Sequence, residues 1–295
     1  MNVQELGNAK ELRRTLRLAP SYSKPLAPTK NLNFYNKVIW ITGASSGIGS
    51  ALARHLAAQG ARLILSSRRT DMLEQLRIEL TNSSHHHVVK LDLEQPEALY
   101  DRVQNVIGDW GPIDILINNA GIAQHSRVLE TQLAVDRRIM EINFFGTVAM
   151  TKAILPSMVA QGAGQIMTIS SVAGKIGSQT RSSYSASKHA LNGYMDSLRA
   201  EVWHSGVHIQ LACPGWVNTD IGKGALDGAG IPLANRVGTI DFGISAEECA
   251  QGIAKALLMH RDETVIGRGW VRIAPTLKRI FPNLVHRIMR RQVYQ

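Results

Sequence analysis

The chain has 295 residues, a formal net charge of +10 at pH 7 and a hydrophobic fraction of 44%. No apolar run reaches the roughly 18 residues of a membrane-spanning helix, and no apolar core of signal-peptide length precedes the globular part. Aromatic residues make up only 5% and no nucleic-acid-binding signature accompanies the charge, which argues against a nucleic-acid partner. Cys213 and Cys249 are too few for a disulfide framework, so we expect a cytoplasmic protein.

Residues 1–36 are interpreted as a basic arm and linker. Arg13, Arg14 and Arg17 stand among leucines, and a proline-bearing stretch from Pro20 to Pro28 follows. This pattern is typical of a short helix joined by a linker to a globular domain.

From residue 37 onward, strand patterns alternate with helical patterns. Strands are expected at 38–42, 62–66, 88–92, 113–117, 165–170, 207–212 and 263–267. The alternation predicts an α/β fold: a Rossmann-like, doubly wound parallel sheet of about seven strands with helices on both faces. Ligands of such sheets bind beyond the carboxyl ends of the strands.

A glycine-rich turn connects the first expected strand to the first expected helix. Its spacing is Gly-x-x-x-Gly-x-Gly, which differs from the Gly-x-Gly-x-x-Gly of longer dinucleotide-binding enzymes. Glycines allow a tight turn and a close approach to a pyrophosphate, whose charge the helix N-terminus stabilises. The residues predicted to bind the cofactor here are Gly43, Ser45, Ser46, Gly47, Ile48 and Gly49.

The end of the second strand bears on the choice of cofactor. An acidic residue there accepts hydrogen bonds from the ribose 2′-hydroxyl of NAD, whereas arginine pairs with the 2′-phosphate of NADP. This chain has Ser67, Arg68 and Arg69 at that place and no acid. NADP(H) is therefore favoured over NAD(H). The alternative is that both arginines merely begin a solvated helix.

The stretch from Ser83 to His87 contains three consecutive histidines. No cysteine or carboxylate cluster accompanies them, and a polar surface loop explains the composition. We predict no metal site.

Tyr184 and Lys188 lie four residues apart and therefore share one helix face, with Ser171 thirteen residues upstream of the tyrosine. A phenol with a pKa near ~10 becomes an acid-base catalyst at neutral pH when a fixed cation stabilises its phenolate. Lowering its pKa to ~7 takes about 4 kcal/mol, which Coulomb attraction in a partly dry cleft can supply. Taken alone, Tyr-x-x-x-Lys also occurs on ordinary exposed helices.

Further motifs follow in a fixed order: Asn118-Asn119-Ala120-Gly121, Asn143, Ser170-Ser171 and Pro214-Gly215. Together with the glycine turn and the Tyr/Lys pair, they make the chain similar to the single-domain short-chain dehydrogenase/reductase family, from about Lys37 to about Gly267. The Ser-Ser-Arg-Arg turn and the basic C-terminus resemble its hydroxysteroid-dehydrogenase-like branch. The resemblance implies an NADP-binding catalytic domain over 37–270 and a homodimer or homotetramer.

The resemblance also implies roles for the catalytic residues. Tyr184 would exchange the proton, Ser171 would hold the substrate oxygen, and Lys188 would lower the pKa of Tyr184 and bind the nicotinamide ribose. Asn143 would hold a water in the proton relay, although by itself it could equally cap or kink a helix. The remaining cofactor contacts implied are Asp92, Leu93, Asn119, Ala120, Gly121, Pro214, Gly215, Val217 and Thr219.

The substrate side is marked by the glycine-rich stretch from Trp216 to Pro232, which is expected to form a mobile lid. Ser245-Ala246-Glu247-Glu248 has the form of a capping box that begins the next helix. Trp216, Leu226, Ile231 and Ile176 are candidates for an apolar pocket or for ordinary packing. We expect an apolar carbonyl or alcohol substrate.

Residues 271–295 form a basic amphipathic segment interrupted by Pro282. Three placements remain open: peripherally on an anionic membrane surface, against a partner subunit, or over the chain's own active site.

The sequence as a whole predicts an NADP(H)-dependent oxidoreductase, a carbonyl reductase or alcohol dehydrogenase (EC 1.1.1.-). The alternative is a non-catalytic dinucleotide-binding regulatory or scaffold protein, in which a broken Ser/Tyr/Lys set is expected. The set is complete here, which favours the enzyme.

Overall fold

The computed structural model describes residues 33–234 and 243–291. Most of the predicted N-terminal arm, with its helix and linker, lies outside these residues. The same is true of 235–242 and of the last four residues.

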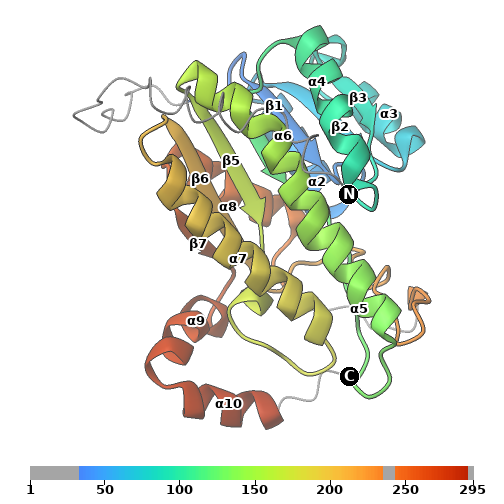
Figure 1. Cartoon of the computed structure of the whole chain (residues 1–295), viewed down its shortest axis with the longest axis vertical. Helices are drawn as coiled ribbons and strands as arrows, with labels where there is room; N and C mark the ends of the chain where they lie inside the picture. Colours follow the sequence, from blue (N-terminus) through green and yellow to red (C-terminus); the bar gives the residue numbers. More distant parts are fainter. Residues whose placement is uncertain (1–32, 235–242, 292–295) are drawn as a thin grey trace, which may run out of the picture. The chain divides into compact units, whose positions relative to one another are not determined.

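Seven parallel strands form one sheet in the order β3-β2-β1-β4-β5-β6-β7 (Figure 1). The strands are β1 (Val38–Thr42), β2 (Arg62–Ser67), β3 (His87–Lys90), β4 (Ile115–Asn118), β5 (Gly164–Ile169), β6 (Val207–Pro214) and β7 (Glu263–Ile266). Each strand overlaps its predicted range, and the doubly wound fold is confirmed. The strand order reverses between β1 and β4, so ligands are expected at the carboxyl ends of these two strands.

Helices cover both faces of the sheet. The main helices are α2 (Gly47–Ala57), α3 (Thr70–Glu79), α4 (Leu99–Trp110), α5 (Leu133–Met140), α6 (Gly146–Gln161), α7 (Ser182–Val202), α8 (Ala246–Leu258), α9 (Trp270–Ile280) and α10 (Pro282–Arg291). Apolar residues of α2, α3 and α8 bury one face, and those of α4, α6 and α7 bury the other. The strands are apolar on both faces for this reason.

The helical run from Leu133 to Gln161 joins α5 and α6 through a π-helical turn at Glu141–Phe145. It is long and apolar enough to span a membrane by length and composition, with a mean hydropathy of 1.3, and half of its window is buried inside the protein. Its apolar residues Met150, Ile154 and Met158 belong to the sheet-packing core. This burial is typical of a core helix in a globular domain.

The triple-histidine stretch is less exposed than the sequence suggested. His86 is buried, and its Nδ1 accepts a hydrogen bond from the Leu63 backbone N–H at 3.2 Å. Its Nε2 lies 2.9 Å from the Thr81 carbonyl oxygen, and His87 stacks on Trp110. These histidines therefore connect β3 to its neighbours.

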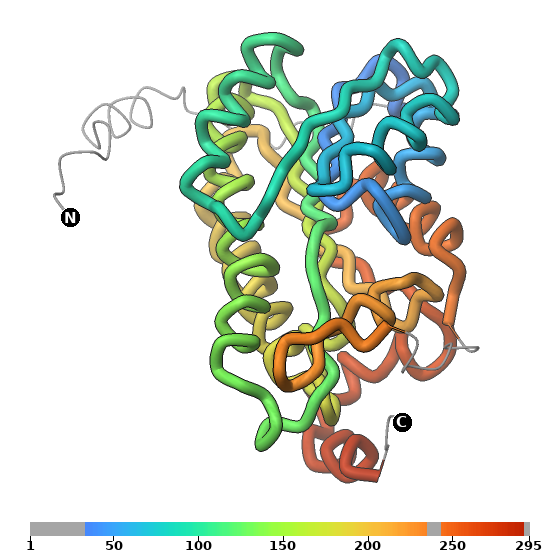
Figure 2. Tube along the Cα trace, turned by 90° about the vertical axis from the view of Figure 1, so that its right-hand side faces the viewer, coloured from blue at the N-terminus to red at the C-terminus, as the bar shows by residue number. Residues whose placement is uncertain are grey.

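The C-terminal segment packs on the chain's own catalytic end as far as it is described. Val285 of α10 and Ala274 of α9 are buried against Ile176. Lys278 Nζ donates to the Lys175 carbonyl oxygen at 2.6 Å. Both views show α9 and α10 below the sheet, at the end where the segment after β6 also lies (Figures 1 and 2). The buried side of this segment therefore packs over the chain's own catalytic end, which is one of the three placements left open by the sequence.

Candidate active site

The glycine turn joins β1 to α2 at the sheet's switch point. Gly43 and Gly47 have positive φ angles of 66° and 57°, which favour glycine. Asn119, at the end of β4, donates from Nδ2 to the carbonyl oxygens of Thr42 and Gly43 at 3.0 and 3.1 Å. A side chain at Gly49 would overlap the Gly43 carbonyl and come within 2.6 Å of Asn119 Nδ2. The turn is therefore held closely by the neighbouring strand.

The N-terminus of α2 has the properties of a phosphate-binding site. Ser46 is its N-cap residue, and its side chain makes no capping hydrogen bond to the helix. The first backbone N–H groups of a helix favour an anion when no side chain caps them. Arg69 donates to the hydroxyls of Ser45 and Ser46 at 2.9 and 2.8 Å, which places a cation beside this N-terminus. These residues fit a phosphate-bearing dinucleotide.

The two arginines after β2 occupy different places. Arg68, which the sequence favoured as the phosphate-binding base, lies with its Nη1 3.8 Å from Glu94 Oε2, and its side chain is half exposed. Glu94 also pairs with Arg138 at 3.0 Å. Ser67 Oγ accepts a hydrogen bond from the Arg69 backbone N–H at 3.0 Å. In this structure Arg69 is therefore the arginine that contacts the glycine turn.

Other predicted cofactor residues surround the same strand ends. Asp92 accepts a hydrogen bond from the Glu94 backbone N–H at 3.1 Å, and Leu93 is buried against Gly146 of α6. Ala120 packs over the glycine turn, where a Cβ at Gly43 would lie 2.7 Å from Ala120 Cα. These residues form one side of the predicted cofactor site, and the segment after β6 forms the other side.

That other side follows Pro214, the last residue of β6. Gly215 donates from its backbone N–H to the Ile266 carbonyl oxygen at 2.8 Å, and Val217 forms an isolated bridge with Ile244. Thr219 reaches across to the glycine turn, since a Cβ at Gly47 would lie 3.2 Å from its Cγ2. The two sides of the predicted cofactor site thus approach each other at Gly47.

Asn143 lies in the π-helical turn and is fully buried. Its Oδ1 accepts from the Ile122 backbone N–H at 2.8 Å, and its Nδ2 donates to the Ile122 carbonyl oxygen at 2.9 Å. Nδ2 also lies 3.0 Å from Ser187 Oγ on α7. Gly121 allows this approach, because a Cβ there would lie 3.0 Å from Asn143 Oδ1. The side chain joins the end of β4 to the helix that carries Tyr184.

Tyr184 is buried in one cluster with Ala173 of the Ser171 loop, and Ser171 Oγ accepts a hydrogen bond from the Ala173 backbone N–H at 3.1 Å. Burial raises the pKa of Tyr184 above its ordinary value, while the nearby Ser171 hydroxyl and the charge of Arg181 act in the opposite direction. Lys188 is buried too, and burial lowers its pKa to about 8. Its Nζ donates to the Ile169 carbonyl oxygen at 2.8 Å and lies 5.9 Å from the centroid of the Tyr184 ring.

In the polypeptide alone the net shift of the Tyr184 pKa is upward, against the lowering that the sequence led us to expect from Lys188. The reason is that removing the phenolate from water is unfavourable, and this effect outweighs the nearby charges. The tyrosine hydroxyl is therefore protonated at neutral pH.

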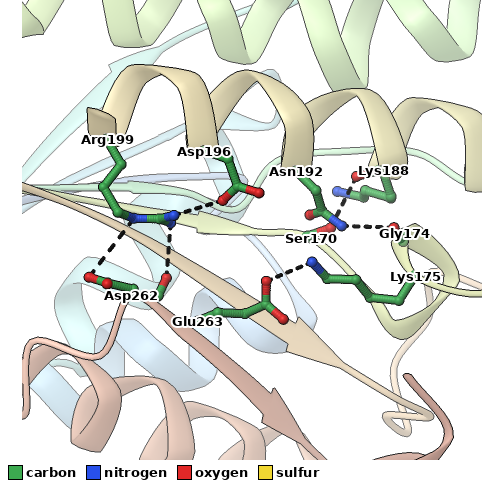
Figure 3. A network of polar contacts seen from close by, with 9 residues as sticks. All are labelled: Ser170, Gly174, Lys175, Lys188, Asn192, Asp196, Arg199, Asp262 and Glu263. Carbon is green, nitrogen blue, oxygen red and sulfur yellow. Dashed lines mark hydrogen bonds and ion pairs between the residues drawn. The ribbon is translucent and has the colours of Figure 1, made fainter. Parts of the chain in front are cut away.

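A network of polar contacts holds the Ser171 loop in place (Figure 3). Asn192 of α7 donates to the Gly174 carbonyl oxygen at 2.8 Å, and Lys175 pairs with Glu263 of β7 at 2.6 Å. Ser170 is buried and donates to the Lys188 carbonyl oxygen at 3.3 Å, whereas the partly exposed Ser171 lines the cleft. The second serine is thus the one available to a ligand.

Beside Ser171 lies a cavity of about 330 Å³. Its lining is mostly apolar and comes from the Ser171 loop, the segment after β6 and the two C-terminal helices: Ser171, Val172, Ala173, Ile176, Ser178, Arg181, Gly215, Trp216, Ile244, Gly267, Arg268, Trp270, Val271, Ala274 and Met289.

Two of the four predicted pocket residues, Ile176 and Trp216, line this cavity. Leu226 instead packs in a buried cluster with Val135 and Ile139, which is the alternative of ordinary packing, and Ile231 is 57% exposed and does not line this cavity. The glycine-rich backbone turns at these positions, and a pattern without periodicity does not show which side chains point inward.

Sequence reasoning missed Arg181, whose guanidinium lies 4.9 Å from the centroid of the Trp216 ring. It also missed Trp270, Val271 and Met289 of the C-terminal helices as cavity walls. The apolar spacing of this segment was the signal that could have indicated them.

A family profile described as short chain dehydrogenase matches residues 37–229. The chain belongs to the short-chain dehydrogenase/reductase family. Dehydrogenase/reductase SDR family protein 7-like from Anopheles gambiae is 40% identical over 262 residues, which cover 87% of this chain and 83% of that protein.

Solved structures of family members share this fold. A short-chain dehydrogenase/reductase from Burkholderia phymatum in complex with NAD has a TM-score of 0.74 at 22% identity, covering 86% of this chain and 96% of that one. An alcohol dehydrogenase from Thermococcus sibiricus complexed with 5-hydroxy-NADP has a TM-score of 0.67 at 26% identity, covering 78% and 96%.

Family membership establishes the chemistry at the level of its class. The protein is an oxidoreductase that acts on CH–OH or C=O groups with a nicotinamide dinucleotide. The fold implies binding of a small-molecule substrate and a cofactor, and sheets of this kind bind ligands at the carboxyl ends of their strands.

Proposed function

We propose that this protein is an NADP(H)-dependent carbonyl reductase in which Tyr184 donates the proton. The observation that carries the proposal is Ser171 on the wall of a mostly apolar cavity, with the buried Tyr184 in one cluster with Ala173 of the same loop and Lys188 Nζ 5.9 Å from the centroid of the tyrosine ring. A bound nicotinamide supplies or accepts the hydride. The catalytic domain is inferred to span 37–270.

Each catalytic side chain has a defined task in this proposal. Ser171 donates a hydrogen bond to the substrate oxygen, and Tyr184 transfers a proton to the same oxygen as negative charge develops there. Lys188, whose pKa is lowered to about 8 by burial, binds the ribose hydroxyls and stabilises the phenolate that the transfer leaves. Asn143 keeps the end of β4 at a fixed distance from α7.

Carbonyl reduction begins with the protonated form of Tyr184. Burial raises the pKa of Tyr184, so its phenol is protonated at neutral pH and is ready to donate. Alcohol oxidation would require the phenolate at the start, and raising the pH would favour it.

We infer a preference for NADP(H) from the two arginines after β2 and from the absence of an acid at Ser67. Arg69 lies against the glycine-turn hydroxyls, and Arg68 is half exposed and held only by a 3.8 Å ion pair with Glu94, so both cations are available to a 2′-phosphate. Arg68→Ala and Arg69→Ala are each expected to weaken NADPH binding about tenfold or more, with a smaller effect on NADH. Equal losses for both nucleotides would contradict this preference.

The mostly apolar lining of the cavity favours an apolar ketone or aldehyde as substrate. We further propose a cytoplasmic location, with contact at a membrane surface through the C-terminal segment, and a homodimer or homotetramer as the assembly.

The decisive experiment measures NADPH and NADH oxidation over a panel of aldehydes, ketones, quinones and steroids, with Tyr184→Phe as the paired variant. Loss of the Tyr184 hydroxyl is expected to lower kcat by roughly 10²- to 10⁴-fold while NADPH still binds. A panel without turnover, together with intact NADPH binding, would instead support the alternative of a dinucleotide-binding regulatory or scaffold protein.

A further inference from the structure

The outer surface of the C-terminal helices combines positive charge with exposed apolar side chains. We call α9 and α10 (residues 270–291) the C-terminal hairpin. No acidic residue follows Glu263 in the sequence. The exposed cations of the hairpin are Arg272, Arg279, Arg287, Arg290 and Arg291.

Five large apolar side chains of the C-terminal hairpin are exposed to solvent, among them Trp270 at 37%. Ile273 is 57% exposed, Ile280 62%, Phe281 56% and Leu284 48%. Ile273 and Ile280 lie seven residues apart on α9 and therefore share one helix face. Ile280, Phe281 and Leu284 gather where α9 passes into α10. The inner face of the same hairpin is occupied, since Val285 is fully buried.

The inner face also lines two hollows that share residues, one of them beside Ser171. A second, shallow hollow of about 310 Å³ is lined by Gly177, Ser178, Gln179, His286, Met289 and Arg290. It shares Ser178 and Met289 with the cavity beside Ser171. The hairpin thus has a basic, apolar outer surface and an inner face that lines the cavity beside Ser171.

We propose that the C-terminal hairpin docks on an anionic lipid surface and admits apolar substrate from that surface to the cavity. The inference deepens the reductase function and rests on it for the substrate. Arginine side chains beside exposed apolar side chains match the anionic headgroups and the acyl boundary of a bilayer. If this surface were in contact with water only, polar side chains would be expected in place of Ile280, Phe281 and Leu284.

The first test is co-sedimentation of the full chain with phosphatidylcholine vesicles and with vesicles that contain 30% phosphatidylserine. Wild type is expected to pellet with the anionic vesicles and much less with the neutral ones. The triple variant Ile280→Ser/Phe281→Ser/Leu284→Ser is expected to lose this binding about tenfold or more. Arg279→Gln/Arg287→Gln is expected to lose roughly 25-fold, about fivefold for each cation.

A matched control exists elsewhere on the protein. Val128, Leu129 and Leu133 are also exposed, at 70%, 99% and 62%, and lie outside the C-terminal hairpin. Their triple serine variant should bind anionic vesicles as wild type does. Undiminished binding by the hairpin variants would overturn the proposal, since the basic N-terminal arm would then be the lipid-binding segment. Binding lost equally in the control would overturn it as well.

The second test separates this proposal from the reductase function. The hairpin triple variant should reduce a water-soluble aldehyde at the wild-type rate and an apolar ketone carried in anionic vesicles several-fold more slowly. If wild type reduces neither substrate, the proposed function fails, whereas vesicle binding still decides the docking surface. A hairpin variant that dissociates an oligomer and keeps full vesicle binding would show that a second copy of the chain is the partner.

Discussion

Replacing Asn143 by alanine tests whether the π-helical turn positions the catalytic helix. The substitution removes both hydrogen bonds to the backbone of Ile122 and the one to Ser187 Oγ. An unpaired buried polar group destabilises a protein by about 1–3 kcal/mol. Ile122 is only partly buried, so water can compensate in part, and the free energy of unfolding should fall by about 2–3 kcal/mol in total.

Urea unfolding measures this loss. With a slope of about 3 kcal/mol per molar urea, the midpoint should fall by roughly 1 M. Because Asn143 connects the end of β4 to α7, kcat should also fall, by about tenfold to a hundredfold, through displacement of Tyr184.

Gln210 provides a matched control. It is a buried amide on β6 that donates to the carbonyl oxygens of Ala256 and Arg261 at 3.0 and 3.1 Å, away from the cleft. Gln210→Ala should lose a similar free energy of unfolding and keep kcat at saturating substrate. An Asn143→Ala variant with unchanged kcat, or with a stability loss below about 0.5 kcal/mol, would refute the reasoning.

Three further predictions concern the cofactor turn, the buried lysine and the Ser171 loop. Gly49→Ala should weaken nucleotide binding, measured by calorimetry, at least tenfold because the new methyl group overlaps the turn. In the control Gly108→Ala the methyl group meets nothing within 4 Å in α4, and the free energy of unfolding, measured in urea, should rise by about 0.5–1 kcal/mol. Equal nucleotide affinity of the two variants would contradict the overlap. Burial lowers the pKa of Lys188 to about 8, so the folded state binds this proton less tightly than the unfolded state does. The free energy of unfolding of wild type should therefore rise relative to Lys188→Met as the pH increases from about 8 toward 10.5, by up to about 1.4 kcal/mol per pH unit. A pH-independent difference between the two proteins would exclude the effect. Glu263→Gln breaks the ion pair with the partly exposed Lys175 and should lower the free energy of unfolding by less than about 1 kcal/mol. It should also raise KM, because the Ser171 loop is then held less firmly. If the stability difference between wild type and variant is the same in high salt, the ion pair is not its cause.

The sequence alone determined the sheet and most of the cleft. Strands buried on both faces are nearly continuous apolar runs, and the turns between them carry glycine and asparagine for steric reasons that are local. The strand positions predicted from this pattern differ from those observed by no more than two residues at each end. Placing Ser171, Tyr184 and Lys188 at strand ends and on one helix face required only chain order and helical periodicity.

Only the tertiary structure determined the direction of the Tyr184 pKa shift, the contact of Arg69 and the residues that line the cavity. The raised pKa of Tyr184 follows from burial by segments far apart in the chain, which no spacing reveals. The same holds for Arg69, whose contact with Ser45 and Ser46 depends on how the turn after β2 packs beside α2. For Leu226 the sequence left a pocket wall and ordinary packing open, because a glycine-rich segment has no period to orient its side chains, and the structure shows packing with Val135 and Ile139.

The C-terminal hairpin shows most clearly which properties follow from the sequence and which depend on the tertiary structure. Its amphipathic pattern follows from the sequence, because apolar and basic residues recur at helical spacing. Three placements satisfied that pattern equally well. Only packing of Ala274 and Val285 against Ile176 selected the inner face and brought Met289 to the substrate cavity. Periodicity specifies that a helix has an apolar face, whereas the surface that buries this face is set by contacts distant in sequence.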